Sequence, residues 1–202
     1  MKLYYLQGAC SLASYIALLE AGQKFDGVAV DRSKKAADGK DFLTVNPKGY
    51  VPALVLDDGQ VLTENVAVLL YAASLNPAAR LAPAPGTLAY FRVVEWLAYV
   101  NSEVHKNFSP LFRPDTPDQA RTAQKALLAR RLGLVEQTLA AGGPFLTGAD
   151  FTVADAYLYV TLSWSGRVGV DLAALPKVRE YFERIRARPA VRRARLEEGL
   201  EP

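Results

Sequence analysis

The sequence predicts a small α/β domain with a mixed sheet, followed by an all-helical domain. Strand and helix patterns alternate up to Leu75, and only helical patterns follow the linker. Between the two regions, residues 76–86 carry three prolines and a glycine, a composition typical of a linker. We therefore place the first domain at residues 1–79, the linker at 80–86 and the helical domain at 87–202.

The elements of the first domain follow from strand-prone runs, helix signals and one turn. Gly22 is a good C-cap for a first helix, and Asp57-Asp58-Gly59 is a strong hairpin signal between two short strands. In order, we expect strand Lys2–Tyr5, helix Ser11–Ala21, strand Phe25–Val30, an exposed loop or helix over Asp31–Lys40, strands Ala53–Leu56 and Gln60–Leu62, and helix Thr63–Leu75.

The helical domain is predicted from apolar spacing and from helix-start signals. Phe91, Val94, Leu97 and Val100 lie near helical spacing within Leu88–Phe108. Thr116-Pro-Asp-Gln119 predicts a capping box that opens a helix to about Ala140, and Thr152-Val-Ala-Asp155 predicts a second cap. The helix after that cap holds Tyr157 and Trp164, and Pro176 opens another helix through Arg186.

Composition excludes several classes of function. The 24 Lys and Arg residues exceed the 21 Asp and Glu residues by only three, too few to predict nucleic-acid binding. One cysteine excludes an internal disulfide, and one histidine excludes a multi-histidine metal site, so we expect no metal. No apolar run reaches the ~18–20 residues of a membrane span, and we expect a cytoplasmic protein.

Cys10 is the first candidate for chemistry, because it stands between a predicted strand and the start of a helix. The backbone N–H groups of a helix N-terminus favour a thiolate and lower the pKa of a thiol. A small buried residue is the alternative role for Cys10. Ser11 is a possible donor to sulfur, although a helix N-cap is its more ordinary role. Tyr5, at the end of the first strand, is either a second donor or part of the core.

Two further segments are candidate binding elements. If the Val51–Pro52 bond is cis, the backbone of Val51 turns outward and can pair with an extended peptide, whereas a trans bond gives an ordinary turn. Glu64 and Asn65 open a helix whose N–H groups suit a carboxylate, while the Glu64 carboxylate suits an ammonium group. Together they would bind an amino-acid zwitterion, and helix capping alone is the alternative.

Several polar side chains complete the candidates. Ser102 and His105 share one helix face, where His105 is either a catalytic group or an ordinary polar residue. Lys106 beside it supplies positive potential for an anion. Lys35 lies in the polar loop, as a solvated side chain or as a partner for a carboxylate.

These residues stand in motifs that jointly resemble a bacterial beta-class glutathione S-transferase. The resemblance covers essentially the whole chain, in order. Its motifs are Met1-Lys-Leu-Tyr-Tyr5, Gly8-Ala-Cys-Ser-Leu12, Asn46-Pro-Lys-Gly-Tyr-Val-Pro-Ala-Leu54, Leu62-Thr-Glu-Asn65, Ser102-Glu-Val-His-Lys106, Pro110-Leu-Phe112 and Phe151-Thr-Val-Ala-Asp155.

The resemblance implies a fold, an assembly and a co-substrate. It implies a thioredoxin-like first domain with a four-stranded mixed sheet, an all-α second domain and a homodimer with the active site near its interface. It also implies that Pro52 is cis, that Val51 pairs with the cysteinyl backbone of glutathione, and that Glu64 and Asn65 hold the γ-glutamyl end. Lys35 would meet the glycyl carboxylate.

The resemblance further implies roles around the glutathione sulfur. Cys10 would lie beside that sulfur, with His105 and Lys106 near it and Ser102 and Glu103 close by, partly across the dimer interface. Thr152 and Asp155 match a structural N-capping box of the family. The chain departs from the family at Ala98, where members often carry an Asn that contacts glutathione.

The predicted function is conjugation of glutathione to an apolar electrophile, as in detoxification. Cys10 and His105 are the predicted catalytic residues, with Ser11 and Tyr5 as alternative donors to the thiolate. Disulfide exchange or peroxide reduction through Cys10, and ligand binding without catalysis, are the alternatives.

Overall fold

A computed structural model describes residues 1–201, which form two compact units. The first unit combines Met1–Ala82 with the C-terminal segment that begins at Ala187, and the second spans Pro83–Arg186. The α/β and all-helical fold classes are therefore confirmed. The C-terminal segment differs from the domain limits expected above, because its helix packs against the first helix of the chain rather than within the helical unit.

The first unit is built on a four-stranded mixed sheet with the strand order β2-β1-β3-β4. Strand β1 runs parallel to β2 and antiparallel to β3, so that Leu3 lies opposite both Gly27 and Leu54. The Asp57–Gly59 turn joins the antiparallel strands β3 and β4, as the hairpin signal predicts. The strands are β1 (Lys2–Tyr5), β2 (Asp26–Ala29), β3 (Ala53–Val55) and β4 (Val61–Thr63).

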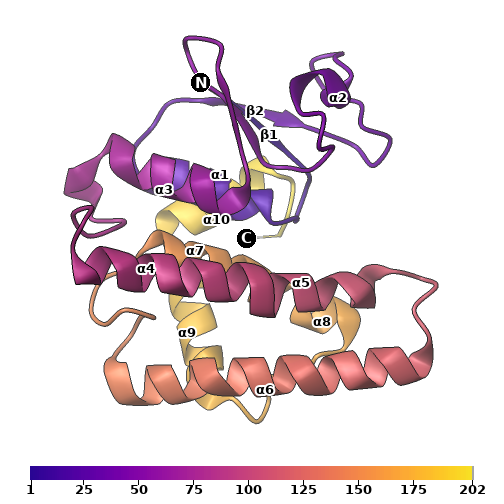
Figure 1. Cartoon of the computed structure of the whole chain (residues 1–202), viewed down its shortest axis with the longest axis vertical. Coiled ribbons are helices and arrows are strands. Elements are labelled where there is room, and N and C mark those ends of the chain that lie inside the picture. Colours follow the sequence, from indigo (N-terminus) through magenta and orange to yellow (C-terminus); the bar gives the residue numbers. More distant parts are fainter. Residues whose placement is uncertain (202) are drawn as a thin grey trace. The chain divides into compact units, whose positions relative to one another are not determined.

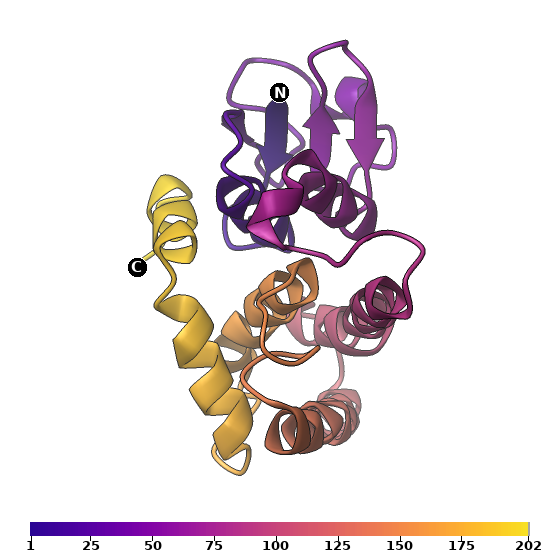
Figure 2. The ribbon, with the colours of Figure 1, turned by 90° about the vertical axis from the view of Figure 1, so that its left-hand side faces the viewer.

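Helices α1 (Ser11–Glu20) and α3 (Asn65–Leu75) lie side by side against this sheet (Figures 1 and 2). Their inner faces bury Leu12, Ile16 and Leu69 completely. The sequence misses the short helix α2 (Phe42–Val45), which Asp41 caps and which buries Phe42. A 3₁₀ turn, η1 (Pro77–Ala79), follows α3.

Helix α10 (Pro189–Glu197) packs along α1, and polar side chains connect the two helices. Arg188 donates two hydrogen bonds to the Glu20 carboxylate, at 2.6 and 2.9 Å. The Tyr15 hydroxyl donates to Glu197 at 2.6 Å. These contacts tie the C-terminal segment to the helix that begins next to Cys10.

The second unit is a set of helices around α7 (Val153–Ser163), in which every residue from Val153 to Leu162 is buried. The other elements are α4 (Leu88–Tyr99), the π-helix η2 (Val100–His105), α5 (Lys106–Phe108), η3 (Ser109–Phe112), α6 (Asp118–Gly142), α8 (Ser165–Val168) and α9 (Pro176–Arg186). Helix α7 contacts α4, η2 and α9, and α6 contacts α5 and α9 (Figure 1).

Local signals in this unit are partly confirmed. Thr152 and Asp155 form the predicted capping box, and Pro176 opens α9 through Arg186. The capping box at Thr116 is wrong, because the Thr116 hydroxyl donates to Pro110 O instead and the cap position of α6 is Pro117. In the first unit, the expected N-cap role of Ser11 is also wrong, because Ser11 is the first residue of α1 and Cys10 holds the cap position.

The predicted helix over Leu88–Phe108 is present but changes its hydrogen-bond pattern. Leu97 and Val100 are buried as expected, whereas Phe91 is 55% exposed. At η2 the Lys106 N–H donates to Asn101 O, five residues earlier, which defines a π-helical turn. Along residues 1–201, no helix is both long enough and apolar enough to cross a membrane.

Candidate functional site

Cys10 stands at the cap position of α1, directly after a turn that glycine permits. Gly8 has a φ of +67°, in the left-handed region that residues with a Cβ rarely adopt. The Cys10 side chain is partly exposed, and its thiol donates to Val51 O across 3.4 Å. A thiol therefore lies at a helix N-terminus, where the backbone dipoles favour its ionised form.

The Ser11 hydroxyl forms its hydrogen bonds with the backbone of the turn before α1. Its side chain is buried, accepts the Leu6 N–H at 3.1 Å and returns a longer bond to Leu6 O at 3.4 Å. The Ser11 hydroxyl thus closes the turn between β1 and α1. This geometry supports a structural role.

The Val51–Pro52 peptide bond is cis. Pro52 is buried, and Val51 is half-buried against the core cluster of Tyr4, Val28 and Phe42. The Val51 carbonyl that accepts the Cys10 thiol brings the two predicted residues together, although they are 41 positions apart in the chain.

Glu64 precedes α3 with a φ of +72°, and its carboxylate is solvent-exposed. Lys48 donates to Glu64 at 2.8 Å and to the Thr63 hydroxyl at 3.0 Å. A carboxylate, an ammonium group and the first N–H groups of an 11-residue helix therefore lie together. Such a set can bind both charges of a zwitterion.

Asn65 is the first residue of α3, but its side chain is buried against α1. Its Oδ1 accepts the Ser14 hydroxyl at 2.7 Å, and its Nδ2 has no hydrogen-bond partner. At the exposed side of this site, Asn65 can therefore act only through its backbone N–H.

Tyr5 and Lys35 lie in different surroundings. The Tyr5 ring packs edge-on against Tyr15 at 5.6 Å, and burial, reinforced by Glu198 and Glu197, raises the pKa of its phenol. Lys35 is exposed, and its backbone N–H donates to Asp31. Tyr5 is thus a neutral phenol, whereas Lys35 is a solvated cation.

A buried carboxylate lies beneath the Gly8 turn. Glu198 accepts the Gly8 N–H at 2.8 Å, while its Oε1 is buried without a partner. Burial raises the pKa of Glu198 from 4.5 to about 8, against the hydrogen bond from Gly8 and the charge of Arg195. Glu198 is therefore largely protonated at neutral pH.

In the helical unit, His105 belongs to a chain of polar side chains. Its Nδ1 lies 2.6 Å from the Tyr157 hydroxyl, which donates to Asn101 Oδ1 at 3.0 Å. Asn101 and His105 stand on η2, and Tyr157 is completely buried on α7. The sequence identifies His105 alone, because the partner lies 52 positions further along the chain.

Aromatic rings surround His105. Its ring lies 5.0 Å from Trp164, which also contacts Phe108 and Phe112 at 5.7 and 5.8 Å. Burial, with Lys106 as a smaller cause, lowers the pKa of His105 from 6.5 to about 4. The imidazole is therefore neutral at neutral pH.

The other predicted polar residues of η2 and α5 face solvent or one another. The exposed Ser102 donates to Ala98 O at 2.9 Å, as an i−4 helix contact. Glu103 pairs with Arg131 at 2.8 Å. Lys106 is exposed. Only His105, of these four, makes its side-chain contact with buried aromatic rings.

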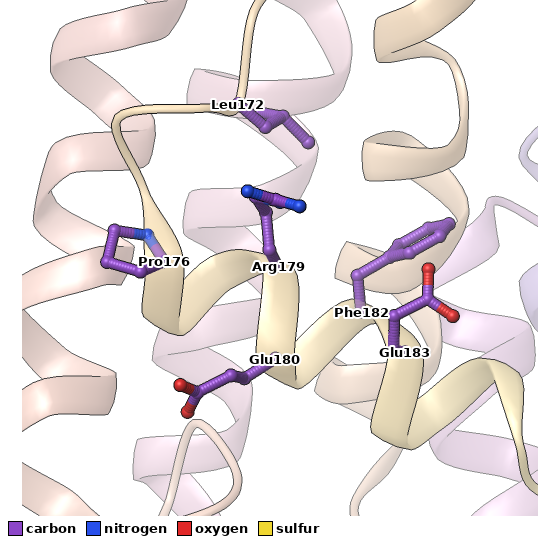
Figure 3. A pocket seen from close by; sticks show the side chains of 6 residues that line it. All are labelled: Leu172, Pro176, Arg179, Glu180, Phe182 and Glu183. Carbon is purple, nitrogen blue, oxygen red and sulfur yellow. The ribbon is translucent and has the colours of Figure 1, made fainter.

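A surface cavity of about 620 Å³ opens elsewhere in the helical unit, along α9 (Figure 3). The predicted site residues are absent from its lining, which consists of Leu172, Pro176, Arg179, Glu180, Phe182 and Glu183. Across the described part of the chain, no three His, Cys, Asp or Glu side chains group to hold a metal ion.

Comparison with known proteins decides the family. Family models of the glutathione S-transferase N-terminal and C-terminal domains match residues 9–75 and 118–184. Glutathione S-transferase GstA of Escherichia coli O157:H7 is 43% identical over the full length of both chains. The chain belongs to the glutathione S-transferase family.

Solved structures of the family agree with this assignment. A sphingomonad glutathione S-transferase complexed with glutathione is 49% identical, with a TM-score of 0.95. The match covers 99% of this chain and 100% of the sphingomonad chain. A beta-class glutathione S-transferase of Sphingomonas chungbukensis is 47% identical, with the same TM-score and the same coverage. The resemblance to the bacterial beta class is thereby confirmed.

The roles of the individual residues stay predictions. Within the first unit, the fold brings Cys10 to Val51 and sets Glu64 at the start of α3. Sequence reasoning missed Lys48, although its place in the Asn46-Pro-Lys-Gly-Tyr50 motif was a usable signal. It also missed the contact of His105 with Tyr157 and that of Tyr157 with Asn101, for which no local signal exists.

Proposed function

We propose that the chain transfers glutathione to apolar electrophiles, by addition or substitution of the glutathione thiolate at an electrophilic carbon. The observation that carries this proposal is the N-terminus of α1 at Cys10, next to the Val51 backbone. Membership of the family supports glutathione as the co-substrate.

The binding roles follow from the chemistry of glutathione, γ-Glu-Cys-Gly. The Val51 backbone would pair with the cysteinyl residue. Glu64 would take the γ-glutamyl ammonium group, while Lys48 and the Asn65 N–H take its α-carboxylate. Lys35 would meet the glycyl carboxylate region.

The chemical demand on the site is modest. Lowering the pKa of a thiol by two units requires about 2.7 kcal/mol of differential stabilisation. The N-terminus of α1 and one or two hydrogen-bond donors can supply this amount. Cys10 is the proposed donor in the first unit. Its surroundings favour it over Ser11, whose hydroxyl bonds to Leu6, and over Tyr5, whose phenol packs against Tyr15.

The experiment is to incubate the reduced protein with glutathione and a chlorinated nitroaromatic, and to record conjugate formation against a blank without enzyme. The proposal predicts saturable turnover. Glutathione binding by calorimetry without turnover would contradict transfer and favour a redox or carrier function. Failure to bind glutathione would contradict the proposed site itself.

Thiol–disulfide exchange is a second candidate function, because the Cys10 thiol is partly exposed. The Cys10 thiolate would attack the disulfide of a glutathionylated substrate, form a mixed disulfide with glutathione and release the substrate thiolate. A second glutathione thiolate would then release Cys10 and leave as oxidised glutathione. A mixed-disulfide assay measures this reaction directly.

We also propose a homodimer and a cytoplasmic location, on the basis of the resemblance to bacterial beta-class members. Leu88 and Phe91 support the dimer, because they leave 71% and 55% of two large apolar side chains of α4 exposed. Sedimentation velocity should give twice the chain mass, and a monomer at micromolar concentration would contradict the dimer.

A further inference from the structure

One buried polar pair joins α1 to α3 inside the first unit. The Ser14 hydroxyl donates to Asn65 Oδ1 at 2.7 Å, and the two residues keep only 0% and 6% of their surface exposed. Ser14 is the fourth residue of α1, and Asn65 is the first residue of α3. The bond therefore lies near the N-termini of two helices that run side by side (Figure 1).

The buried side chains of α1 and α3 around this pair are mostly apolar, among them Leu12, Ile16 and Leu69. Apolar contacts have no preferred direction, so they hold two helices together without fixing how far one lies along the other. A hydrogen bond is directional and does fix this register. A single buried Asn sets the register of a coiled coil in the same way.

The hydrogen bonding of this pair is incomplete. The Ser14 hydroxyl meets only one polar atom of the Asn65 amide, and Asn65 Nδ2 is buried without a hydrogen-bond partner. A buried donor without a partner costs free energy, and replacing both members of a polar pair by apolar groups of similar shape is nearly neutral or stabilising. Stability alone therefore does not account for the pair.

The pair lies next to the residues on which the proposed binding of glutathione depends. Cys10 caps α1 four residues before Ser14, on the same helix face, and its thiol donates to Val51 O at 3.4 Å. Glu64, at the cap position of α3, has a φ of +72°, a strained conformation that persists only where the surrounding structure holds it. Asn65 directly follows Glu64 and anchors it to α1.

We infer that Ser14 and Asn65 are positioning residues, whose hydrogen bond fixes the start of α3 relative to the start of α1. The inference rests on the proposed function, in which the glutathione thiol lies at α1 and the γ-glutamyl end lies at α3. One molecule meets both points only while the spacing between them is kept. Both side chains are buried, so they act through the backbone of the two helices.

The decisive variant replaces the pair by apolar residues, as Ser14→Ala combined with Asn65→Leu. We expect its melting temperature to stay within about 3 °C of the parent or to rise, because no buried amide is left unpaired. Its dissociation constant for glutathione, measured by calorimetry, should weaken about three- to tenfold, although the backbone N–H of position 65 is retained.

Two results with this double variant would overturn the inference. One is an affinity for glutathione equal to that of the parent. The other is a weaker affinity that comes only with a large fall in melting temperature, because the pair would then contribute packing alone.

Hydrogen exchange of the double variant without ligand tests the register itself. The Val68 N–H closes the first turn of α3 by donating to Glu64 O at 3.0 Å, whereas Ala73 lies near the other end of the helix. We expect the Val68 amide to exchange at least about fivefold faster than in the parent, and the Ala73 amide to change by less than about twofold. An unchanged Val68 amide, or an equal change at both amides, would overturn the inference.

The matched control is Asn76→Ala, at the opposite end of the same two helices. Asn76 Nδ2 donates to Ala21 O, just beyond the last residue of α1, at 3.1 Å. We expect this variant to lower the melting temperature by about 2–4 °C and to keep the dissociation constant for glutathione within about twofold. A loss of affinity as large as in the double variant would overturn the specific role of Ser14 and Asn65.

The two readouts separate this inference from the proposed function. If the parent protein binds no glutathione, the proposed function fails, while the exchange of the Val68 amide still tests the pair. If the parent and the double variant bind glutathione equally, the inference fails and the proposed function stands.

Discussion

The two units present different kinds of functional groups. In the first unit, the groups around Cys10, Val51 and Glu64 are backbone dipoles, helix N-termini and exposed charges. In the helical unit, His105 contacts the buried Tyr157 hydroxyl, which in turn donates to the partly exposed Asn101. The first arrangement suits recognition of a charged peptide, whereas the second keeps a neutral imidazole among aromatic rings.

Two of the groups that burial shifts toward their neutral form, Glu198 and His105, have opposite consequences for stability as pH changes. The folded pKa of Glu198 is raised, so the unfolded chain loses this proton first and stability falls as pH rises from 4.5 to about 8. The folded pKa of His105 is lowered, so stability falls as pH decreases from 6.5 to about 4.

Replacing the Cys10 thiol should give the largest change in activity. Cys10→Ser should abolish disulfide exchange, by at least about 10³-fold, because the chain has no second cysteine. Conjugation should keep its rate within about tenfold, since the N-terminus of α1 still faces the co-substrate thiolate. Both assays are run on one preparation. Collapse of conjugation as well would make Cys10 its catalytic group.

The helical unit should be the more sensitive to loss of a buried side chain. Asp155 accepts from Leu146 N, from the N–H and hydroxyl of Thr152, and from the Tyr181 hydroxyl, at 2.8–3.0 Å. Asp155→Ala leaves these donors buried and should lower the free energy of unfolding by about 3–5 kcal/mol. Urea unfolding measures this change.

The control for that variant is Asp118→Ala, in the first turn of α6. Asp118 is exposed, and we expect a change within about 0.5 kcal/mol. An equal loss of unfolding free energy in the two variants would show that the buried hydrogen bonds of Asp155 stabilise the fold no more than an exposed carboxylate does.

The loss of stability at high pH that is assigned to Glu198 can be tested separately. Glu198→Gln keeps a neutral side chain that can accept the Gly8 N–H, and should match the parent at pH 4. At pH 8.5 it should be more stable than the parent by roughly 1–2 kcal/mol, because the variant has no carboxyl group that ionises more readily in the unfolded chain than in the folded one. Thermal unfolding across pH measures this. A parallel gain from the exposed control Glu201→Gln would refute the assignment to Glu198.

The smallest effect concerns an exposed ion pair. Lys48 and Glu64 keep 54% and 68% of their side chains exposed, so Lys48→Ala should change stability by less than about 0.5 kcal/mol. Glutathione affinity should nevertheless weaken about three- to tenfold if Lys48 takes the γ-glutamyl carboxylate. Calorimetry decides, and an unchanged dissociation constant would remove Lys48 from the site.

The same contrast explains what the sequence could predict. The Cys10 turn, the hairpin and the start of α3 carry local signals, because glycine, proline and helix-start residues act over a few positions. Cys10 and Glu64 therefore emerged as candidates from single segments. Their family resemblance then supplied the cis bond of Pro52, which the structure contains.

The remaining features depend on distant packing. The π-helical turn over Val100–His105 interrupts an ordinary apolar pattern, and no residue type marks it in advance. The contact of Tyr157 with His105 joins two helices, and Glu198 meets Gly8 from the other end of the chain. The misassigned cap at Thr116 has a local cause, since its hydroxyl donates to Pro110 O within the preceding turn instead of capping α6.

We propose that Glu64 holds the γ-glutamyl end of glutathione and that His105 is a catalytic residue. The most direct measurement compares calorimetric affinity and kcat for Glu64→Gln and His105→Gln. We predict that Glu64→Gln weakens the dissociation constant about tenfold, whereas His105→Gln keeps it within twofold and lowers kcat by about 10²-fold. Loss of affinity in His105→Gln, with affinity retained in Glu64→Gln, would contradict this division.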